Sequence, residues 1–531
     1  MNFISYSCRV LMPVTALMVL GPWFLSPTGS TPVEGWATLP LAMGFVALIE
    51  LLLQIRIGAF RTALPGFTVL LLCLTGAIWS HEVLVIIGAL LALGFSLLRA
   101  LSFLLDRMRR GGALVVFLFF LAPVLVGALL LVQPRCQGGG DPLTGSEAIF
   151  TAVSAVTVTG LTVIDVGSRL SVEGQWLLLG LIQLGGLGVI SLFAFFAMVL
   201  SNGLGIRQGR AVRDALDGVG IAELKQLLSV IVISTLLVET IGTLLLFLAP
   251  ESKGSFFDAL FHAISAFCNA GFSLHSTSLE SYPTISRAVM ALLIIVGGLG
   301  FPVLLDLWRH YRSGRSQRVP LQTRLILSVS FILLAVGGLL LSITGAGPDA
   351  WFWTVTARTA GFNTSSTSQL PLASTLVLMF LMGIGASPGS TGGGLKTTTL
   401  GVLVLATWSE LRGGGPVVAW KRWIPDTVIR TAAVLTIIGM LLWGILLGLL
   451  LLVEKGQSYQ FIDYAFEVTS ALATVGLSRG VTSELSVSGQ WIIEVAMICG
   501  RLGPLALVLA MASISSTTTR GERPAGRVML G

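Results

Sequence analysis

The stretch "FTAVSAVTVTGLT", residues 150–162, occurs four times in this chain in related form. The other copies are "FHAISAFCNAGFS" (261–273), "WFWTVTARTAGFN" (351–363) and "FEVTSALATVGLS" (466–478). Each copy begins with an aromatic residue ten positions before a glycine, and a bulky apolar residue and a small polar residue follow that glycine. An internal repeat defines the structural unit of a chain, so the fold is best argued from these four segments.

The composition around the repeats is that of a membrane protein. The 531 residues are 54% hydrophobic and 11% charged, with a mean hydropathy of +0.91, whereas soluble domains have about 25% charged residues. A membrane-spanning helix needs ~20 apolar residues. Twelve such segments lie near 9–29, 37–55, 63–79, 82–105, 113–133, 175–200, 226–249, 286–306, 325–345, 371–410, 431–453 and 489–513. We therefore predict an all-α polytopic membrane protein.

Basic residues predict the orientation of these segments. Arginine clusters such as 107–110, 207–213 and 309–318 follow even-numbered segments, and cytoplasmic loops carry an excess of Lys and Arg. We therefore expect both termini in the cytoplasm of a multi-pass cell-membrane protein, with the four repeats on the outside. The net charge of +7 follows from these loops and does not indicate a nucleic-acid partner.

Each repeat lies between two apolar segments, so the unit is span, half-segment, span. The predicted units are 112–204, 225–312, 322–412 and 428–515, with an N-terminal extension of about four spans (1–111) and a tail (516–531). Ten helical residues cover about 15 Å, half of a ~30 Å hydrocarbon core. Such a helix can enter the membrane from outside and end near its middle, and the chain that follows can lead back out as a non-helical segment. An acid near its start, such as Glu147, Asp258 or Asp463, suits the positive end of its dipole, and its other end favours a cation.

Four such loops arranged pseudo-fourfold around one central pore would present a ring of backbone carbonyls to a cation. Glycine allows the backbone angles that this needs, and carbonyl rings replace the hydration shell of potassium. We expect this filter to be the only site on the chain that binds a metal ion. The candidate filter residues are Val158, Thr159, Gly160, Leu161, Asn269, Ala270, Gly271, Phe272, Thr359, Ala360, Gly361, Phe362, Thr474, Val475, Gly476 and Leu477.

At this point the chain resembles the Trk/Ktr/HKT superfamily of potassium transporters over roughly 112–515. The stretches "GLIQLGGLG" (180–188), "RTAGFN" (358–363) and "GRLGPL" (500–505) make it most similar to the Ktr-type pore subunit. The resemblance implies that K⁺ is the ion bound at the filter and that a homodimer takes up potassium on a cytoplasmic ring of nucleotide-binding RCK-type subunits. It also implies sodium as a candidate activator and no cofactor on this chain. Glycine in all four loops implies a preference for potassium over sodium. The basic loops 309–324 and 412–430 either bind the cytoplasmic ring or only determine the orientation of the spans in the membrane.

The stretch "GASPGSTGGGLKTTT" (385–399) interrupts the tenth apolar segment. It is not a Walker A loop, because Leu395 occupies the lysine position and Lys396 comes one residue late. It is either a flexible kink or, as the resemblance implies, an intramembrane gating loop in the ion path. We expect Lys396 to pair with a carboxylate or carbonyls, or to reach the cytoplasmic interface. The candidate gate residues are Gly385, Ser387, Gly389, Ser390, Thr391, Gly392, Gly393, Gly394, Lys396 and Arg501.

Other polar residues in the spans have two interpretations each. Arg501 is either a cation under the filter, as the resemblance implies, or half of a salt bridge with Glu494 or another buried acid. Glu239 is expected to make a polar contact between helices, with a role in transport as the alternative. Arg358 is expected to brace the third loop, with contact to an ion as the alternative. His262 and His275 are expected to be packed or solvated, since no second histidine or carboxylate stands at metal-ligand spacing. The Asn269 side chain is expected to hold the second loop in place.

Two other classes of function remain as alternatives. A polytopic membrane enzyme would need a catalytic constellation, and the sequence has no H-E-x-x-H motif, acidic cluster or Ser/His pair. A sodium- or proton-coupled transporter with alternating access usually has two inverted halves with broken helices. Four loops of the same kind, each between two spans, favour a pore. We expect membrane lipids to surround it.

Overall fold

The computed structural model describes residues 112–139, 141–187, 221–249, 255–312, 319–455 and 459–503. The predicted N-terminal extension (1–111), with its four apolar segments, lies outside the described residues, and so does the predicted tail (516–531).

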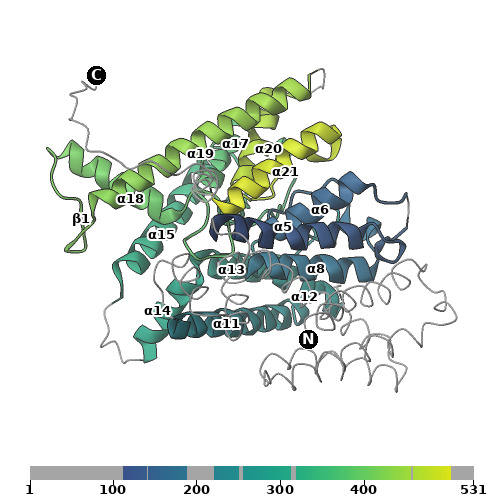
Figure 1. Ribbon diagram of the computed structural model, residues 1–531, viewed down its shortest axis with the longest axis horizontal. Coiled ribbons are helices and arrows are strands. Elements are labelled where there is room, and N and C mark those ends of the chain that lie inside the picture. The colour runs from purple at the N-terminus through teal and green to yellow at the C-terminus, as the bar shows by residue number, and fades with distance from the viewer. Residues whose placement is uncertain are drawn as a thin grey trace, which may run out of the picture.

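The described chain is mostly helical and follows one plan four times: a first helix, a short helix, a glycine loop and a second helix (Figure 1). The first unit contains α5 (Gly112–Leu131), η1 (Pro134–Cys136), α6 (Gly145–Thr157), α7 (Val166–Arg169) and α8 (Val172–Gly186). The second contains α11 (Ile221–Phe247), α12 (Phe256–Phe267), α13 (Thr284–Leu299) and α14 (Phe301–Arg312). The third contains α15 (Leu321–Ile343), α16 (Ala350–Thr356), η2 (Thr367–Gln369), α17 (Leu372–Gly383) and α18 (Thr397–Leu411). The fourth contains α19 (Asp426–Val453), α20 (Phe461–Leu472), η3 (Thr482–Glu484) and α21 (Val487–Leu502). A two-residue hairpin, β1 (Val418–Ala419) with β2 (Arg422–Trp423), connects α18 to α19.

Three helices of the described part are long and apolar enough to cross a membrane: Ser229–Phe247 within α11, α15 and α19. The predicted break in the tenth apolar segment is confirmed, because α17 ends at Gly383 and α18 begins only at Thr397. The prediction of one continuous segment near 286–306 is wrong, because α13 and α14 meet at an angle of 93°. Gly300 lies at the bend with φ of 92°, a conformation that glycine adopts most easily. Pro302 then falls in the first turn of α14, where its missing N–H costs nothing.

The short helices begin as their sequences predict, with one exception. Thr144 with Glu147, and Gln460 with Asp463, form capping boxes at the starts of α6 and α20. α6, α12 and α20 have 13, 12 and 12 residues, whereas α16 has only 7 and is shorter than the ten residues expected. Asp349, at the start of α16, makes no side-chain cap. Its carboxylate instead accepts a hydrogen bond from Arg287 of α13 at 2.9 Å.

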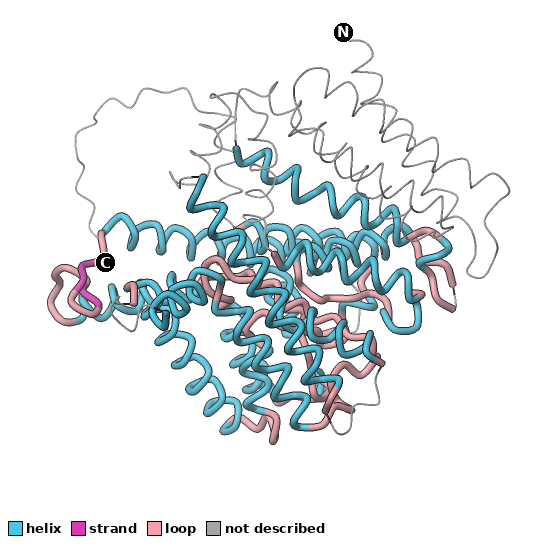
Figure 2. Tube along the Cα trace, turned by 90° about the horizontal axis from the view of Figure 1, so that it is seen from below, coloured by secondary structure: helices cyan, strands magenta, loops and turns pink. Residues whose placement is uncertain are grey.

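The four units pack against one another in a closed order. The second helix of each unit contacts the short helix of the next: α8 contacts α12, α13 contacts α16, α17 contacts α20, and α21 returns to α6. The short helices are thereby surrounded, and most of their residues are buried. Figure 2 shows loop segments running among the helices in the middle of the molecule. The glycine loops are therefore held at the centre of the packed helices, and not at the periphery.

Candidate functional site

The glycine loops share a backbone conformation that the sequence pattern did not reveal. In each loop the residue two positions before the glycine has a left-handed backbone: Val158 (φ 57°), Asn269 (φ 59°), Thr359 (φ 70°) and Thr474 (φ 51°). The glycines themselves also have positive φ: 88° at Gly160, 72° at Gly271, 79° at Gly361 and 94° at Gly476. Positive φ is unfavourable for β-branched residues such as valine and threonine. Its recurrence in all four loops means that the surrounding packing imposes the same turn each time.

The four glycines meet in a closed cycle of contacts, which we call the glycine cycle (Gly160, Gly271, Gly361 and Gly476). A Cβ atom on Gly271 would lie 2.7 Å from the carbonyl oxygen of Ala360. On Gly160, Gly361 and Gly476 it would overlap the carbonyl oxygens of Ala270, Val475 and Thr159, respectively. Each glycine is therefore covered by the carbonyl that precedes the glycine of a neighbouring loop, and no side chain fits there. The candidate filter residues of four distant segments come together at this point.

A buried hydroxyl on or next to each short helix holds the adjacent loop backbone. Ser154 accepts a hydrogen bond from the Gly160 N–H at 3.1 Å, and Ser470 accepts one from Gly476 at 3.0 Å. In the other two loops the hydroxyl is the donor: Ser265 donates to the Phe272 carbonyl (2.8 Å) and Thr356 to the Phe362 carbonyl (2.6 Å). We did not identify these residues from the sequence. A signal was available, since three of the four repeat copies have serine four residues after the first aromatic.

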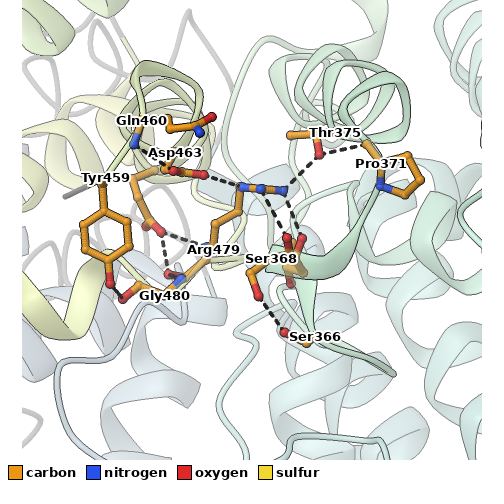
Figure 3. Close-up of polar contacts among 12 residues, drawn as sticks. Ser366, Ser368, Pro371, Thr375, Tyr459, Gln460, Asp463, Arg479 and Gly480 are labelled. Atoms are coloured by element: carbon orange, nitrogen blue, oxygen red, sulfur yellow. Dashed lines mark hydrogen bonds and ion pairs between the residues drawn. The ribbon is translucent and has the colours of Figure 1, made fainter.

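Arg479, three residues after Gly476, ties the fourth loop to the third unit (Figure 3). Its guanidinium donates to Asp463 of α20 (2.7 Å) and to Thr375 of α17 (3.0 Å), and also to the carbonyls of Thr367 (3.1 Å) and Ser368 (3.3 Å). The buried carboxylate of Glu467 accepts hydrogen bonds from the Arg479 N–H (3.0 Å) and from a hydroxyl two residues after the glycine, that of Ser478. The fourth loop is thus fixed just after its glycine as well as at the glycine itself.

The stretch between α17 and α18, which we call the broken-helix loop (385–396), packs against residues close to the glycine cycle. Backbone hydrogen bonds join Ser387 to the Gly298 carbonyl (3.1 Å) and Phe301 to the Gly389 carbonyl (3.0 Å), so the loop packs where α13 and α14 bend. A Cβ on Gly392 would overlap the hydroxyl of Thr359, and one on Gly393 the hydroxyl of Thr474. These glycines therefore let the loop backbone touch the residues two positions before Gly361 and Gly476.

Two cations hold the broken-helix loop. Lys396 donates to the carbonyl of Gly392 at 2.8 Å, one of the partners expected for it. Arg501 of α21 donates to the carbonyls of Thr391 in the loop and of Gly185 in α8. Within the described residues no ion pair joins Arg501 to Glu494, so the structure does not support that alternative. One side chain therefore links the loop to the first and fourth units.

Other polar residues have the partners expected for them, except the two histidines. Glu239 accepts a hydrogen bond from Gln183 of α8 (3.1 Å), and Arg358 donates to Ser330 of α15 (3.1 Å). The Asn269 amide lies 3.3 Å from the Thr359 hydroxyl and links the second and third loops.

The prediction that neither histidine has a partner at metal-ligand spacing is wrong. His262 and His275 lie together with Asp258, with ligand atoms within 4.8 Å of one another. The loop after Gly271 folds back over α12, a proximity that sequence spacing does not reveal.

The chain is similar to known proteins in both sequence and fold. The family model TrkH, described as "Cation transport protein", matches residues 130–519. The Ktr system potassium uptake protein B of Vibrio alginolyticus is 39% identical over 77% of this chain and 92% of its own length. The protein of the same name from Bacillus subtilis is 35% identical over 78% and 96%. The Potassium/sodium uptake protein NtpJ of Enterococcus hirae is 32% identical over 78% and 95%. The crystal structure of the potassium transporter TrkH from Vibrio parahaemolyticus matches with a TM-score of 0.62 at 21% identity and covers 96% of this chain and 98% of its own.

Proposed function

Because this chain belongs to the TrkH family of cation transport proteins, we propose that it is the membrane subunit of a potassium uptake system. Ions would pass through a single pore at the centre of the four units, arranged pseudo-fourfold. The observation that carries this proposal is the glycine cycle, in which each loop places a carbonyl against the glycine of another loop. The relatives named potassium uptake proteins supply the choice of ion.

The selectivity filter of this pore consists of the carbonyls around Gly160, Gly271, Gly361 and Gly476. Four backbone oxygens converging from different loops can replace the hydration shell of a cation. The negative ends of the short-helix dipoles point toward the same place and favour positive charge. Since all four positions are glycine, potassium is preferred over sodium. One relative is named a potassium/sodium uptake protein, so sodium is the competitor that matters.

The broken-helix loop is the gate. It lies against residues that precede the glycine cycle, its non-helical backbone contains few internal hydrogen bonds, and Lys396 and Arg501 hold it through carbonyls. Opening requires those bonds to break and the segment to move aside. The filter loops have their own hydroxyl supports from the short helices, so the gate can move while the filter keeps its shape.

A second chain controls this gate. We propose that the protein works as a homodimer on a cytoplasmic ring of nucleotide-binding RCK-type subunits, with both termini in the cytoplasm. Such partners would bind at the cytoplasmic face. Because cytoplasmic loops carry an excess of Lys and Arg, we assign to this face the basic segment after α14 and the β1–β2 hairpin.

Rubidium uptake into proteoliposomes tests the proposal. The purified full chain should take up radioactive rubidium down a gradient without any hydrolysable substrate, and external potassium should compete far better than sodium. Uptake that is equally blocked by sodium would refute the selectivity proposal, and no uptake with or without a regulatory partner would refute the pore.

A further inference from the structure

Three metal-ligating side chains meet at the outer end of the second unit. Asp258 lies in the first turn of α12 and His262 lies one turn further on, while His275 comes from the loop four residues after Gly271. The carboxylate of Asp258 is 3.4 Å from His262 Nδ1 and 3.1 Å from His275 Nε2. The two imidazole rings lie nearly parallel, with centroids 5.3 Å apart.

We propose that Asp258, His262 and His275 form a binding site for a divalent transition metal ion, with zinc as the ion that the ligand set fits. Two imidazole nitrogens and one carboxylate oxygen are a common zinc set, and a fourth position then remains open. In a tetrahedral site with ligand bonds of ~2.0 Å, neighbouring ligand atoms are about 3.3 Å apart. The two distances from Asp258 agree with that edge, and all three ligand atoms lie within 4.8 Å of one another.

The surrounding groups suit a metal ligand. His262 Nε2 lies 3.0 Å from the Ser273 hydroxyl, so this nitrogen can carry the ring proton and donate it to that hydroxyl when Nδ1 binds the ion. Nδ1 now lies 2.9 Å from the Asp258 carbonyl, and the ion would replace that hydrogen bond. The Tyr282 hydroxyl donates to the second carboxylate oxygen of Asp258 at 3.1 Å and orients it. Metal ligands are usually oriented by such outer hydrogen bonds.

The site is open on one side only. The side chain of His262 is fully buried and that of Asp258 is 16% exposed, while His275 is 40% exposed. An ion can therefore reach the site past His275, which is the ligand free to adjust. The route is on the side where the short helices begin, which is the outer side in the proposed topology.

Occupancy should act on the second loop. Ser273 follows Gly271 by two residues, and its hydroxyl contacts His262 and accepts a hydrogen bond from the His275 N–H at 3.0 Å. An ion bound to both histidines would link His275, in the loop after Gly271, to His262 in α12. The loop between Gly271 and His275 would then be held more firmly against α12. Its positive charge would also oppose the approach of another cation to the loop. External zinc should therefore slow ion uptake, a consequence that depends on the proposed function, whereas zinc binding does not.

Zinc binding to the purified full chain tests the site directly. The protein is prepared in detergent with an affinity tag that contains no histidine, and bound metal is removed with a chelator. Zinc should then bind at one ion per chain in a calorimetric titration. Cobalt should give the visible absorption bands of tetrahedral coordination. His275→Ala should lower the apparent zinc affinity at least about tenfold, because it removes an exposed ligand without disturbing the buried part of α12.

The matched control is His310→Ala, which removes a histidine from the far end of α14 and should leave zinc affinity unchanged. Asp258→Asn provides a second ligand variant and should also weaken binding. The proposal is overturned if the wild-type chain binds no zinc, or if His275→Ala and His310→Ala bind it as the wild type does. In that case the three side chains form only a hydrogen-bonded network. Zinc that binds but leaves rubidium uptake unchanged would overturn the coupling to the second loop.

Discussion

Replacing Gly476 by alanine should show whether a side chain at this position displaces a carbonyl of the filter. Gly480 in the same loop provides the control for backbone strain alone. Gly476 and Gly480 have nearly the same φ, 94° and 96°. A Cβ on Gly476 would overlap the carbonyl oxygen of Thr159 in the first loop, whereas a Cβ on Gly480 would meet nothing within 4 Å. Gly476→Ala and Gly480→Ala therefore impose similar strain, and only the first displaces a carbonyl of the glycine cycle.

The two effects have different sizes and different readouts. Alanine in a left-handed conformation costs roughly 1–2 kcal/mol, so both variants should lose comparable thermal stability. At Gly476 the Thr159 carbonyl must also move away from the centre. A change comparable to one hydrogen bond, about 1.4 kcal/mol, corresponds to about a tenfold loss of potassium preference over sodium. Gly480→Ala should keep the wild-type preference.

The assay is rubidium uptake into proteoliposomes with increasing potassium or sodium as competitor, alongside thermal unfolding of each variant in detergent. Normalising uptake to folded protein removes the stability effect. The reasoning fails if Gly476→Ala keeps the wild-type ion preference. It fails equally if Gly480→Ala loses as much preference as Gly476→Ala, since strain alone would then explain the change.

Three further changes test the gate and the support of the filter. Deleting Gly389–Gly394 should raise rubidium uptake several-fold with ion preference kept; a folded deletion protein with unchanged uptake would make the segment a structural kink. Arg501→Gln removes the bonds to the Thr391 and Gly185 carbonyls and should also raise uptake, and a wild-type rate would show that these bonds do not hold the gate closed. Ser470→Ala leaves the Gly476 N–H without its acceptor, so it should lower stability by about 1 kcal/mol and reduce potassium preference. Unchanged unfolding and unchanged preference together would contradict that role for Ser470.

The sequence alone was sufficient for the membrane class, the mostly helical fold and the break before α18. These features depend on local composition: a long apolar run predicts a span wherever it occurs, and a run of glycines beside Pro388 cannot continue a helix. The repeat was readable because all four copies keep an aromatic residue and a glycine at constant spacing. The sequence did not predict the bend at Gly300. Hydropathy stays high across this position, and hydropathy carries no information about the direction of the backbone.

Only the tertiary structure decided which backbone atoms meet. The carbonyl that covers Gly476 belongs to Thr159, more than three hundred residues earlier, and Arg501 reaches Gly185 across a similar separation. Asp258 and His275 approach because the chain reverses after Gly271 and packs over α12. Such contacts result from the closed packing of helices and from backbone angles that side-chain patterns do not encode. The sequence could therefore predict which segments would form a site, and the packing determined how their atoms are arranged within it.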